Sequence, residues 1–331
     1  MNNWPGGFPP PPAAANDRDA MTTETARPAR PSPAAPGAPA FVLGAPRSGT
    51  SLVYKLLCLH PDAAWLSNYV RRVPSLGWLG ALNRVAARRP ARRRAVWFGA
   101  DGGDAYAYGR SRSAGERAFP QPVEGEPVFA HHGIPDDPGL GAAPGAAAGL
   151  ARTFEQVRRS AGGRVLVNKR IANNGRVGVL VAAFPAARFV RVTRDGRAVA
   201  ASLAAVDWWP DSRVWWYGGT PRLWEADGGA PLALCAEHWV REVDLLEREL
   251  ATHRVEVLDV RYEELVTDPL GTVARVAAHA GLDPDDRRWR ADVSSVRFPD
   301  RTDGWRRRLA AGDVELVEDI QGPTLAQLGY R

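Results

Sequence analysis

The sequence predicts an α/β fold with a P-loop-like parallel central sheet flanked by helices. Short apolar runs typical of buried parallel strands alternate along the chain with amphipathic helical segments. Turns directly follow two of these runs and open the next helix, and the first of these turns is Gly-rich. We therefore expect a single domain over residues 39–331, with right-handed crossovers between parallel strands.

The first half of the chain begins this pattern. A predicted strand, Ala40–Leu43, runs into the Gly-rich turn 44–51, after which apolar residues recur at helical spacing until His60 and Pro61. Residues 75–149 are poorly periodic and rich in Arg, Gly and Pro. We expect helices and long loops there, as an insertion that shapes one side of the site.

The second half alternates strands and helices more regularly. The predicted strands are 164–169, 187–192 and 254–262, and the predicted helices are 177–184, 194–205 and 236–250. No internal repeat interrupts this order. The alternation is what a doubly wound parallel sheet requires.

The composition fits one globular domain. Of 331 residues, 45% are hydrophobic, which allows a sizeable core. Cys58 and Cys235 lie far apart and without metal-ligand spacing, so we expect no disulfide scaffold, no metal site and a reducing, cytoplasmic location. No stretch is apolar over the roughly 18 residues of a membrane span, and the N-terminus lacks the order of a signal peptide.

Residues 1–38 are dominated by Pro, Ala, Gly and Thr. Such a segment cannot bury enough surface to offset its ordering entropy, so we expect a disordered tail. Translation could begin at Met1 or at Met21.

The charge is positive and carried almost entirely by arginine. The net charge is +6, and only Lys55 and Lys169 among the 43 basic residues are lysines. The excess makes arginine clusters less informative, and we interpret those at 88–89 and 92–94 as a solvated helix face. A basic chain suits nucleotides, acidic glycans or nucleic acid without choosing among them.

Residues 44–51 have the spacing of a phosphate-binding loop, with Gly, four residues, Gly and two further positions. Backbone N–H groups in such a turn, with a helix N-terminus behind them, bind a tetrahedral anion. Nucleoside triphosphate loops carry lysine after the second Gly, whereas this chain has Thr50. The loop suits a donor with one substituted 5′-phosphate, and a plain tight turn is the alternative. The candidate ligands are Arg47, Ser48, Gly49, Thr50 and Ser51.

A second phosphate site is predicted after the strand 187–192. Arg194 follows this strand, and Ser202 comes about two helical turns later. A guanidinium group grips phosphate bidentately, so this pair suits a 3′-phosphate. We interpret Asp195 and Arg197 as a helix-terminal and a surface charge.

These motifs resemble those of the sulfotransferase family, in its bacterial, actinobacterial-type members. Gly-Ala-Pro-Arg-Ser-Gly-Thr-Ser at 44–51 is similar to the family's 5′-phosphosulfate loop, and residues 194–202 are similar to its 3′-phosphate segment. The resemblance extends from about Phe41 to Arg331. It implies the sulfotransferase fold and a donor, 3′-phosphoadenosine 5′-phosphosulfate (PAPS), with no metal required.

Two further segments share the resemblance. Arg-Tyr-Glu-Glu-Leu at 261–265, followed by Asp-Pro at 268–269, resembles a family landmark that implies Tyr262 beside the adenine. Residues 304–330 resemble the tail of bacterial members, where a basic loop closes over the cofactor, which implies Trp305 at the donor.

The expected reaction is an in-line displacement at sulfur, in which charge develops on the oxygen that bridges to the leaving phosphate. Arg47 and Lys169 are the candidates to stabilise that charge, because Lys169 ends a strand expected beside the strand of the phosphate loop. An ordinary strand-end lysine is the alternative for Lys169.

The general base does not carry over from the family. Arg170 and Ile171 follow Lys169 where cytosolic members have a histidine, and residues 65–69 lack the glutamate of tyrosylprotein members. We expect the base from the insertion, where the candidates are Glu124, Glu126, His131 and His132, with Glu124 and His132 preferred. We expect His60 to end a helix and His238 to belong to an amphipathic helix.

The acceptor would be a hydroxyl or amine of a small natural product or glycan, as in secondary metabolism. Trp208, Trp209, Trp215 and Trp216 offer flat faces for rings or sugars, or they pack as a surface loop. Two other functions compete. A P-loop kinase would need ATP and Mg²⁺, and a nucleic-acid-binding module would show a steep salt dependence. We expect no nucleic acid partner, and the oligomeric state is not predicted.

Overall fold

The structure is a computed structural model, which describes residues 37–99, 113–297 and 300–330. All of these residues fall in one compact unit. The predicted tail, residues 1–38, lies outside the described residues except for Gly37 and Ala38. Within the described ranges, no helix is both long enough and apolar enough to cross a membrane.

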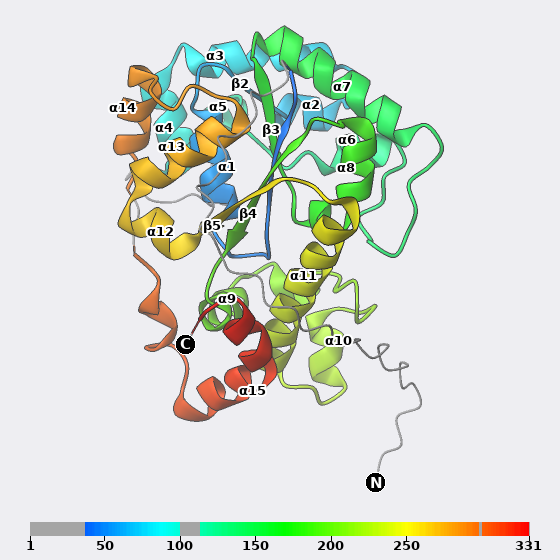
Figure 1. The fold of residues 1–331 in the computed structure, drawn as a ribbon, viewed down its shortest axis with the longest axis vertical. Coiled ribbons are helices and arrows are strands. Elements are labelled where there is room, and N and C mark those ends of the chain that lie inside the picture. Colours follow the sequence, from blue (N-terminus) through cyan, green and yellow to red (C-terminus); the bar gives the residue numbers. More distant parts are fainter. Residues whose placement is uncertain (1–36, 100–112, 298–299, 331) are drawn as a thin grey trace, which may run out of the picture. The chain divides into compact units, whose positions relative to one another are not determined.

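A five-stranded parallel sheet lies at the centre of the fold (Figure 1). The strand order is β2-β3-β1-β4-β5. The strands are β1 (Ala40–Leu43), β2 (Ala63–Trp65), β3 (Val165–Lys169), β4 (Arg188–Thr193) and β5 (Val257–Arg261). The predicted α/β fold with a parallel central sheet is confirmed. The prediction missed β2, and it started the last strand too early because Arg254 is the left-handed cap of the preceding helix.

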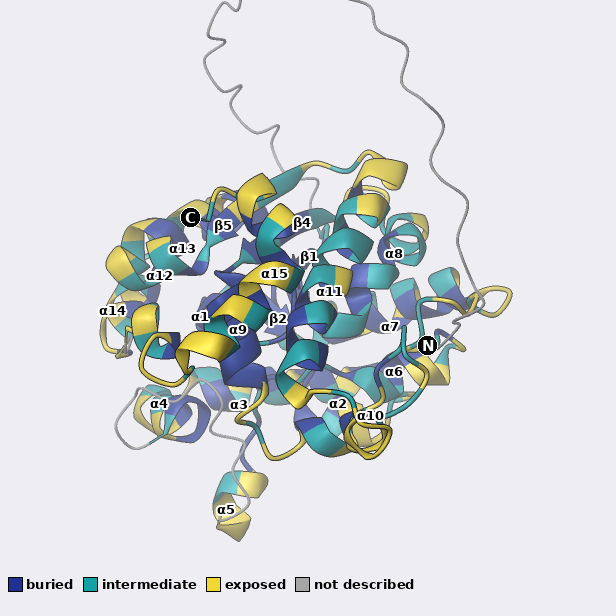
Figure 2. Ribbon diagram, turned by 90° about the horizontal axis from the view of Figure 1, so that it is seen from below, coloured by how far each residue is buried: buried dark blue, intermediate teal, exposed yellow. Residues whose placement is uncertain are grey.

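Strands β1, β2 and β3 are buried along their whole length, and alternate apolar residues of the strands belong to different cores. In β1, Ala40 and Val42 join one core, whereas Phe41 and Leu43 join the other. Helices that follow the strands cover both faces (Figure 1). Figure 2 shows the central strands mostly in the dark blue and teal of buried and intermediate residues, and exposed residues on the outer sides of the helices.

The helices and 3-10 turns connect and cover the strands. In chain order they are α1 (Thr50–Cys58), α2 (Asn68–Arg72), η1 (Gly77–Leu82), α3 (Asn83–Ala87), α4 (Pro90–Phe98), α5 (Ala114–Arg117), α6 (Glu126–His131), α7 (Ala146–Ala161), η2 (Ile171–Gly175), α8 (Val177–Ala183), α9 (Gly196–Leu203), η3 (Trp209–Asp211), α10 (Pro221–Ala226), α11 (Pro231–His253), α12 (Tyr262–Thr267), α13 (Pro269–Ala280), α14 (Arg287–Ser294), η4 (Asp303–Trp305) and α15 (Ala311–Gln327). Helices α1, α8, α9 and α11 include or overlap the predicted helical segments.

The carboxyl ends of the strands bring the predicted site residues to one edge of the sheet. The phosphate loop, residues 44–51, follows β1, and Lys169 is the last residue of the neighbouring strand β3. Arg194 directly follows β4 on the other side of β1, and Tyr262 directly follows β5. This edge, where crossovers leave the central strand in opposite directions, is where open α/β sheets bind ligands.

Candidate active site

The loop after β1 has the backbone of an anion-binding turn. Gly44, Arg47 and Gly49 have φ values of 141°, 67° and 92°. A Cβ atom at Gly44 would lie 2.3 Å from the carbonyl oxygen of Val192, so this position requires glycine. A left-handed backbone conformation is uncommon for residues other than glycine, such as Arg47, and it is found most often at functional sites. Helix α1 begins at Thr50, which places its N-terminal N–H groups directly behind the loop.

Arg47 connects the two predicted phosphate sites. Its Nε donates a hydrogen bond to Oγ of Ser202 over 3.0 Å, which links the loop after β1 to helix α9 after β4. Beside Arg47, the hydroxyl of Ser48 is fully buried and has no hydrogen-bond partner among the described residues. Buried polar atoms are normally paired, so this hydroxyl fits a site that an oxyanion would complete.

Arg194, which directly follows β4, contacts this loop. Its guanidinium donates to the carbonyl oxygens of Arg47 (3.0 Å) and Arg301 (2.9 Å). It also lies over the ring of Tyr262, 4.1 Å from the centroid. The Tyr262 ring in turn packs on Gly49, where a Cβ atom would lie 2.6 Å from Cδ2 of Tyr262. The structure thus brings Arg194 and Tyr262 together with the phosphate loop.

Trp305 ties the C-terminal segment to helix α9. Its side chain is buried against Ala198 and Ala201, and its ring lies 4.7 Å from the guanidinium carbon of Arg197. Arg197 is therefore not the surface charge that the sequence suggested. It is 6% exposed and pairs with Asp195 at 2.9 Å and with Glu318 of α15 at 2.7 Å.

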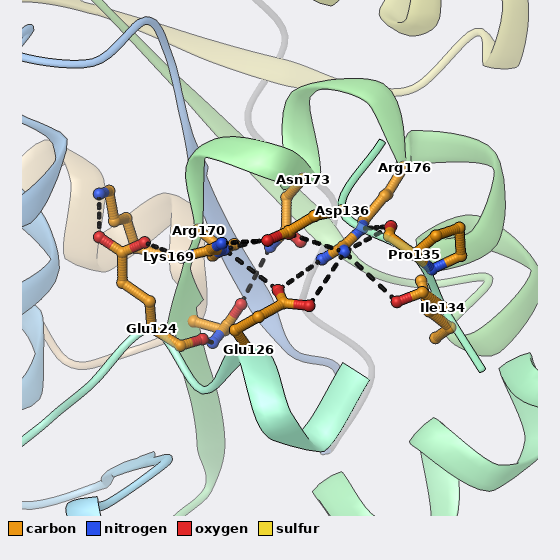
Figure 3. A network of polar contacts seen from close by, with 10 residues as sticks. Glu124, Glu126, Ile134, Pro135, Asp136, Lys169, Arg170, Asn173 and Arg176 are labelled. Carbon is orange, nitrogen blue, oxygen red and sulfur yellow. Dashed lines mark hydrogen bonds and ion pairs between the residues drawn. The ribbon is translucent and has the colours of Figure 1, made fainter. Parts of the chain in front are cut away.

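Lys169 and Glu124 form an ion pair at the end of β3. Nζ of Lys169 lies 2.6 Å from Oε1 of Glu124, and Nη1 of Arg170 lies 3.2 Å from the other carboxylate oxygen (Figure 3). The side chain of Lys169 is buried, whereas that of Glu124 is 32% exposed. Burial alone would raise the pKa of Glu124, but the charges of Lys169 and Arg170 outweigh it and lower this pKa. Glu124 therefore stays ionised at neutral pH.

A carboxylate pair extends this network, as Figure 3 shows. Arg170 and Arg176 both pair with Glu126, at 3.1 and 3.3 Å, and both pair with Asp136. The pKa of Glu126 is raised to about 7, chiefly by burial and next by a hydrogen bond with Asp136. The pKa of Asp136 is lowered, so Glu126 is the member of this pair that holds a proton below neutral pH.

A cavity of about 610 Å³ opens beside this network. Its walls include Pro46 of the phosphate loop together with Glu124 and Arg170. Three of the four clustered tryptophans also line it, namely Trp208, Trp209 and Trp215. The fourth, Trp216, instead donates its indole N–H to Nδ1 of His238 over 3.2 Å. The cavity therefore touches the phosphate loop, the candidate base and a set of aromatic faces.

The other histidines of the sequence analysis lie elsewhere or are already paired. His132 lies 2.9 Å from Oγ1 of Thr153 on α7, and it is not among the described residues that line the cavity. The pKa of His132 is lowered, chiefly by burial and next by the neighbouring His131. Helix α6 ends at His131, and the side chain of His132 contacts Thr153 on α7. His60, after α1, accepts a hydrogen bond from Asp62 and contacts the carbonyl of Asp283.

The sequence analysis assigned His238 only to an amphipathic helix and did not consider Glu242, and both residues lie on α11. His238 and Glu242, four positions apart on one helix face, both line the cavity. Burial lowers the pKa of His238 to about 4 and raises that of Glu242. The sequence could have indicated this pair through a His and a Glu four positions apart, but this spacing is also common on exposed helices that have no functional site. Among the described residues, no group of three or more His, Cys, Asp or Glu side chains could hold a metal.

Comparison with known proteins gives one family and one fold. A profile described as "Sulfotransferase family" matches residues 39–286. Sulfotransferase STF9 from Mycobacterium avium shares 18% identity at a TM-score of 0.54, over 89% of this chain and 78% of that chain. Sulfotransferase STF1 from Mycobacterium tuberculosis H37Rv shares 20% identity at a TM-score of 0.51, over 87% and 77%. No curated protein matches the sequence. At these identities the two structures show a shared fold.

Proposed function

This chain belongs to the sulfotransferase family, and we propose that it transfers a sulfonate group from PAPS to a hydroxyl or amine of a small acceptor. The contact between Arg47 and Ser202 carries this proposal. A donor with a 5′-phosphosulfate and a 3′-phosphate needs two anion sites within one nucleotide's reach. This contact joins two such candidate sites, whereas a nucleoside triphosphate would need the lysine that Thr50 replaces.

Each donor group has a proposed partner. The phosphosulfate binds the loop through Arg47, Ser48, Thr50, Ser51 and the backbone of Gly49. The 3′-phosphate binds Ser202 and Arg194, and the adenine lies beside Tyr262. Trp305 holds the C-terminal segment on α9, so that this segment covers the donor. The left-handed loop backbone and the orphan hydroxyl of Ser48 support this arrangement.

The proposed reaction is a single displacement. The acceptor oxygen or nitrogen forms a bond to sulfur while the bond from sulfur to the bridging oxygen breaks, and the electron pair leaves with 3′-phosphoadenosine 5′-phosphate (PAP). Lys169 and Arg47 stabilise the bridging oxygen. Glu124 takes the proton of the acceptor. Arg170 lies 3.2 Å from Glu124, so it still orients this carboxylate when Lys169 turns to the donor.

The cavity suggests the class of acceptor. Its volume suits a small molecule, and the three tryptophans suit a ring or a sugar. Among the described residues, the lining includes four carboxyl groups, on Glu124, Asp136, Asp137 and Glu242, and two arginines. In a chain of net charge +6, this local excess disfavours an anionic acceptor. We therefore propose a neutral or basic ring compound, as in secondary metabolism. The cytoplasmic location stays a prediction.

A transfer assay tests this function. The full chain, with chelator present, is incubated with sulfur-labelled PAPS and a panel of ring-bearing phenols, alcohols and amines. We expect labelled product together with PAP, both formed about a hundredfold more slowly by Lys169→Met. Labelled phosphate transfer from ATP with Mg²⁺, with PAPS inert, would overturn the proposal in favour of a kinase.

A further inference from the structure

One buried asparagine holds the first residue of the phosphate loop. Asn174 is fully buried in η2, and its Oδ1 accepts a hydrogen bond from the N–H of Gly44 over 3.0 Å. Its Nδ2 donates to the carbonyl oxygen of the same Gly44 over 3.2 Å. Both polar backbone groups of Gly44 are therefore satisfied by one side chain. Two bonds from one planar amide fix the position and the rotation of the backbone where β1 becomes the loop.

Glu242 determines which way this amide faces. Nδ2 of Asn174 also donates to Oε2 of Glu242 over 2.8 Å, and the indole N–H of Trp215 donates to Oε1 over 2.8 Å. Both oxygens of Glu242 thus act as hydrogen-bond acceptors toward N–H donors. A flipped Asn174 amide would point its oxygen at Glu242 and at the Gly44 carbonyl, and both contacts would repel. Glu242 is 3% exposed, so water does not replace these bonds at low cost.

These contacts connect the cavity to the loop. Trp215 and Glu242 both line the 610 Å³ cavity, and the chain of bonds from Trp215 through Glu242 and Asn174 ends at Gly44. We propose that Asn174 is a positioning residue for the donor loop, and that Glu242 sets its amide orientation and so links donor affinity to the acceptor cavity. This inference rests on the proposed function, because it takes residues 44–51 as the donor site.

The neighbouring asparagine provides a matched control. Asn173 is also fully buried in η2, but its Nδ2 donates to Oδ1 of Asn168 over 3.0 Å. Asn168 in turn donates to the backbone carbonyl of Glu124 over 3.1 Å. In Figure 3, Asn173 lies beside the ion-pair network of Glu124. Each asparagine loses buried hydrogen bonds on substitution by alanine, but only Asn174 bonds to the phosphate loop.

The experiment compares PAP binding in the full chain by metal-free calorimetry. We expect both Asn174→Ala and Asn173→Ala to lower the melting temperature, the first by more, because it removes three buried side-chain hydrogen bonds and the second removes one. Only Asn174→Ala should weaken PAP binding, by about tenfold or more, because about 1.4 kcal/mol corresponds to tenfold. Glu242→Gln should weaken PAP binding by about threefold to tenfold. The substituted side chain has one carbonyl oxygen, and when this oxygen accepts from Asn174, its NH2 group faces the indole N–H of Trp215.

The outcomes separate the two proposals. PAP affinities that are equal in Asn174→Ala and Asn173→Ala would overturn the positioning role, and unchanged affinity in Glu242→Gln would overturn the link to the cavity. Failure of wild type to bind PAP would instead overturn the proposed function. If Asn174→Ala does not fold, Glu242→Gln and Trp215→Phe supply the test, with weakened PAP binding in both as the expected result and unchanged binding as the contrary one.

Discussion

Nε of Arg47 lies 3.0 Å from Oγ of Ser202, although 155 positions separate the two residues in the chain. The contact forms because β1 and β4 are neighbours, so the loop after one strand meets the helix after the other. Two anion sites that share a hydrogen bond can be bridged by one ligand. The account of donor binding depends on this proximity.

The first prediction is that Arg47 and Ser202 are coupled in PAP binding. Ser202→Ala should weaken binding by about threefold to tenfold and Arg47→Ala by about tenfold to a hundredfold, as expected for neutral and charged hydrogen bonds. Because the residues touch, the double variant should lose less than the two single losses combined. Calorimetric titrations of the four proteins measure this. Strictly additive losses would show that the two residues contribute to PAP binding independently, which would contradict the coupling.

The second prediction concerns Lys169 and Glu124, whose charged atoms lie 2.6 Å apart. Lys169→Met and Glu124→Gln should each lower turnover by about a hundredfold, in the range for general base and electrostatic catalysis. Both should bind PAP within a few fold of wild type. Turnover is measured with the acceptor that the transfer assay identifies. Full turnover in Glu124→Gln would remove this residue as the base.

The pH profile separates Glu124 from Glu126. A general base must be ionised to act, and the pKa of Glu124 lies below its ordinary 4.5. Turnover should therefore not fall between pH 8 and pH 5 through this residue. The pKa of Glu126 is raised to about 7, so catalysis by Glu126 would give an acid limb with a midpoint near 7. Such a limb, abolished in Glu126→Gln, would assign the base to Glu126.

The third prediction concerns stability and Glu126. Its folded-state pKa of about 7 lies above the ordinary 4.5, because burial and Asp136 favour the protonated form. The stability that this group contributes is full below about pH 4.5 and is lost as pH rises through 7. Glu126→Gln should flatten the fall in unfolding free energy between pH 5 and pH 8, as measured by urea denaturation. The exposed Glu225→Gln serves as the control, and a Glu126→Gln profile as steep as wild type would contradict the prediction.

The fourth prediction uses Gly49, whose φ is 92° and whose added Cβ atom would lie 2.6 Å from Tyr262. Gly49→Ala should destabilise the protein by about 1–3 kcal/mol and weaken PAP binding by more than about tenfold, because it displaces Tyr262 and the loop. Gly145→Ala is the matched control. Gly145 has a φ of 77° but open space around its Cβ position, so its substitution costs stability without changing PAP affinity. Equal PAP affinity in both variants would count against the loop as donor site.

The phosphate loop and its neighbours were predictable because local sequence encodes them. The spacing of the glycines predicts the backbone geometry of residues 44–51, and the apolar run before Lys169 predicts a buried strand. Parallel pairing then places the ends of these strands side by side, as the structure confirms for Lys169 beside β1. The three-residue strand β2 was missed because so short a run carries no periodicity.

The remaining site residues depend on contacts that no local pattern encodes. Arg197 was expected at the surface, but its partner Glu318 comes from a helix 121 positions later. Glu242 sits in a long helix whose sequence does not indicate which acidic side chain faces a cavity. His132 and Glu124 looked equally suited to act as a base, until the turn after α6 directed one toward α7 and β3 placed Lys169 beside the other.

The most direct test of the central claim is a metal-free calorimetric titration of PAP into wild type, Arg47→Ala and Arg159→Ala. Arg159 lies on α7, where its exposed side chain pairs with Glu155, so it controls for the loss of one positive charge. We expect wild type and Arg159→Ala to bind PAP equally and Arg47→Ala to bind at least about tenfold more weakly. No binding by wild type, or equal binding by all three proteins, would contradict a PAPS-type donor held by the loop after β1.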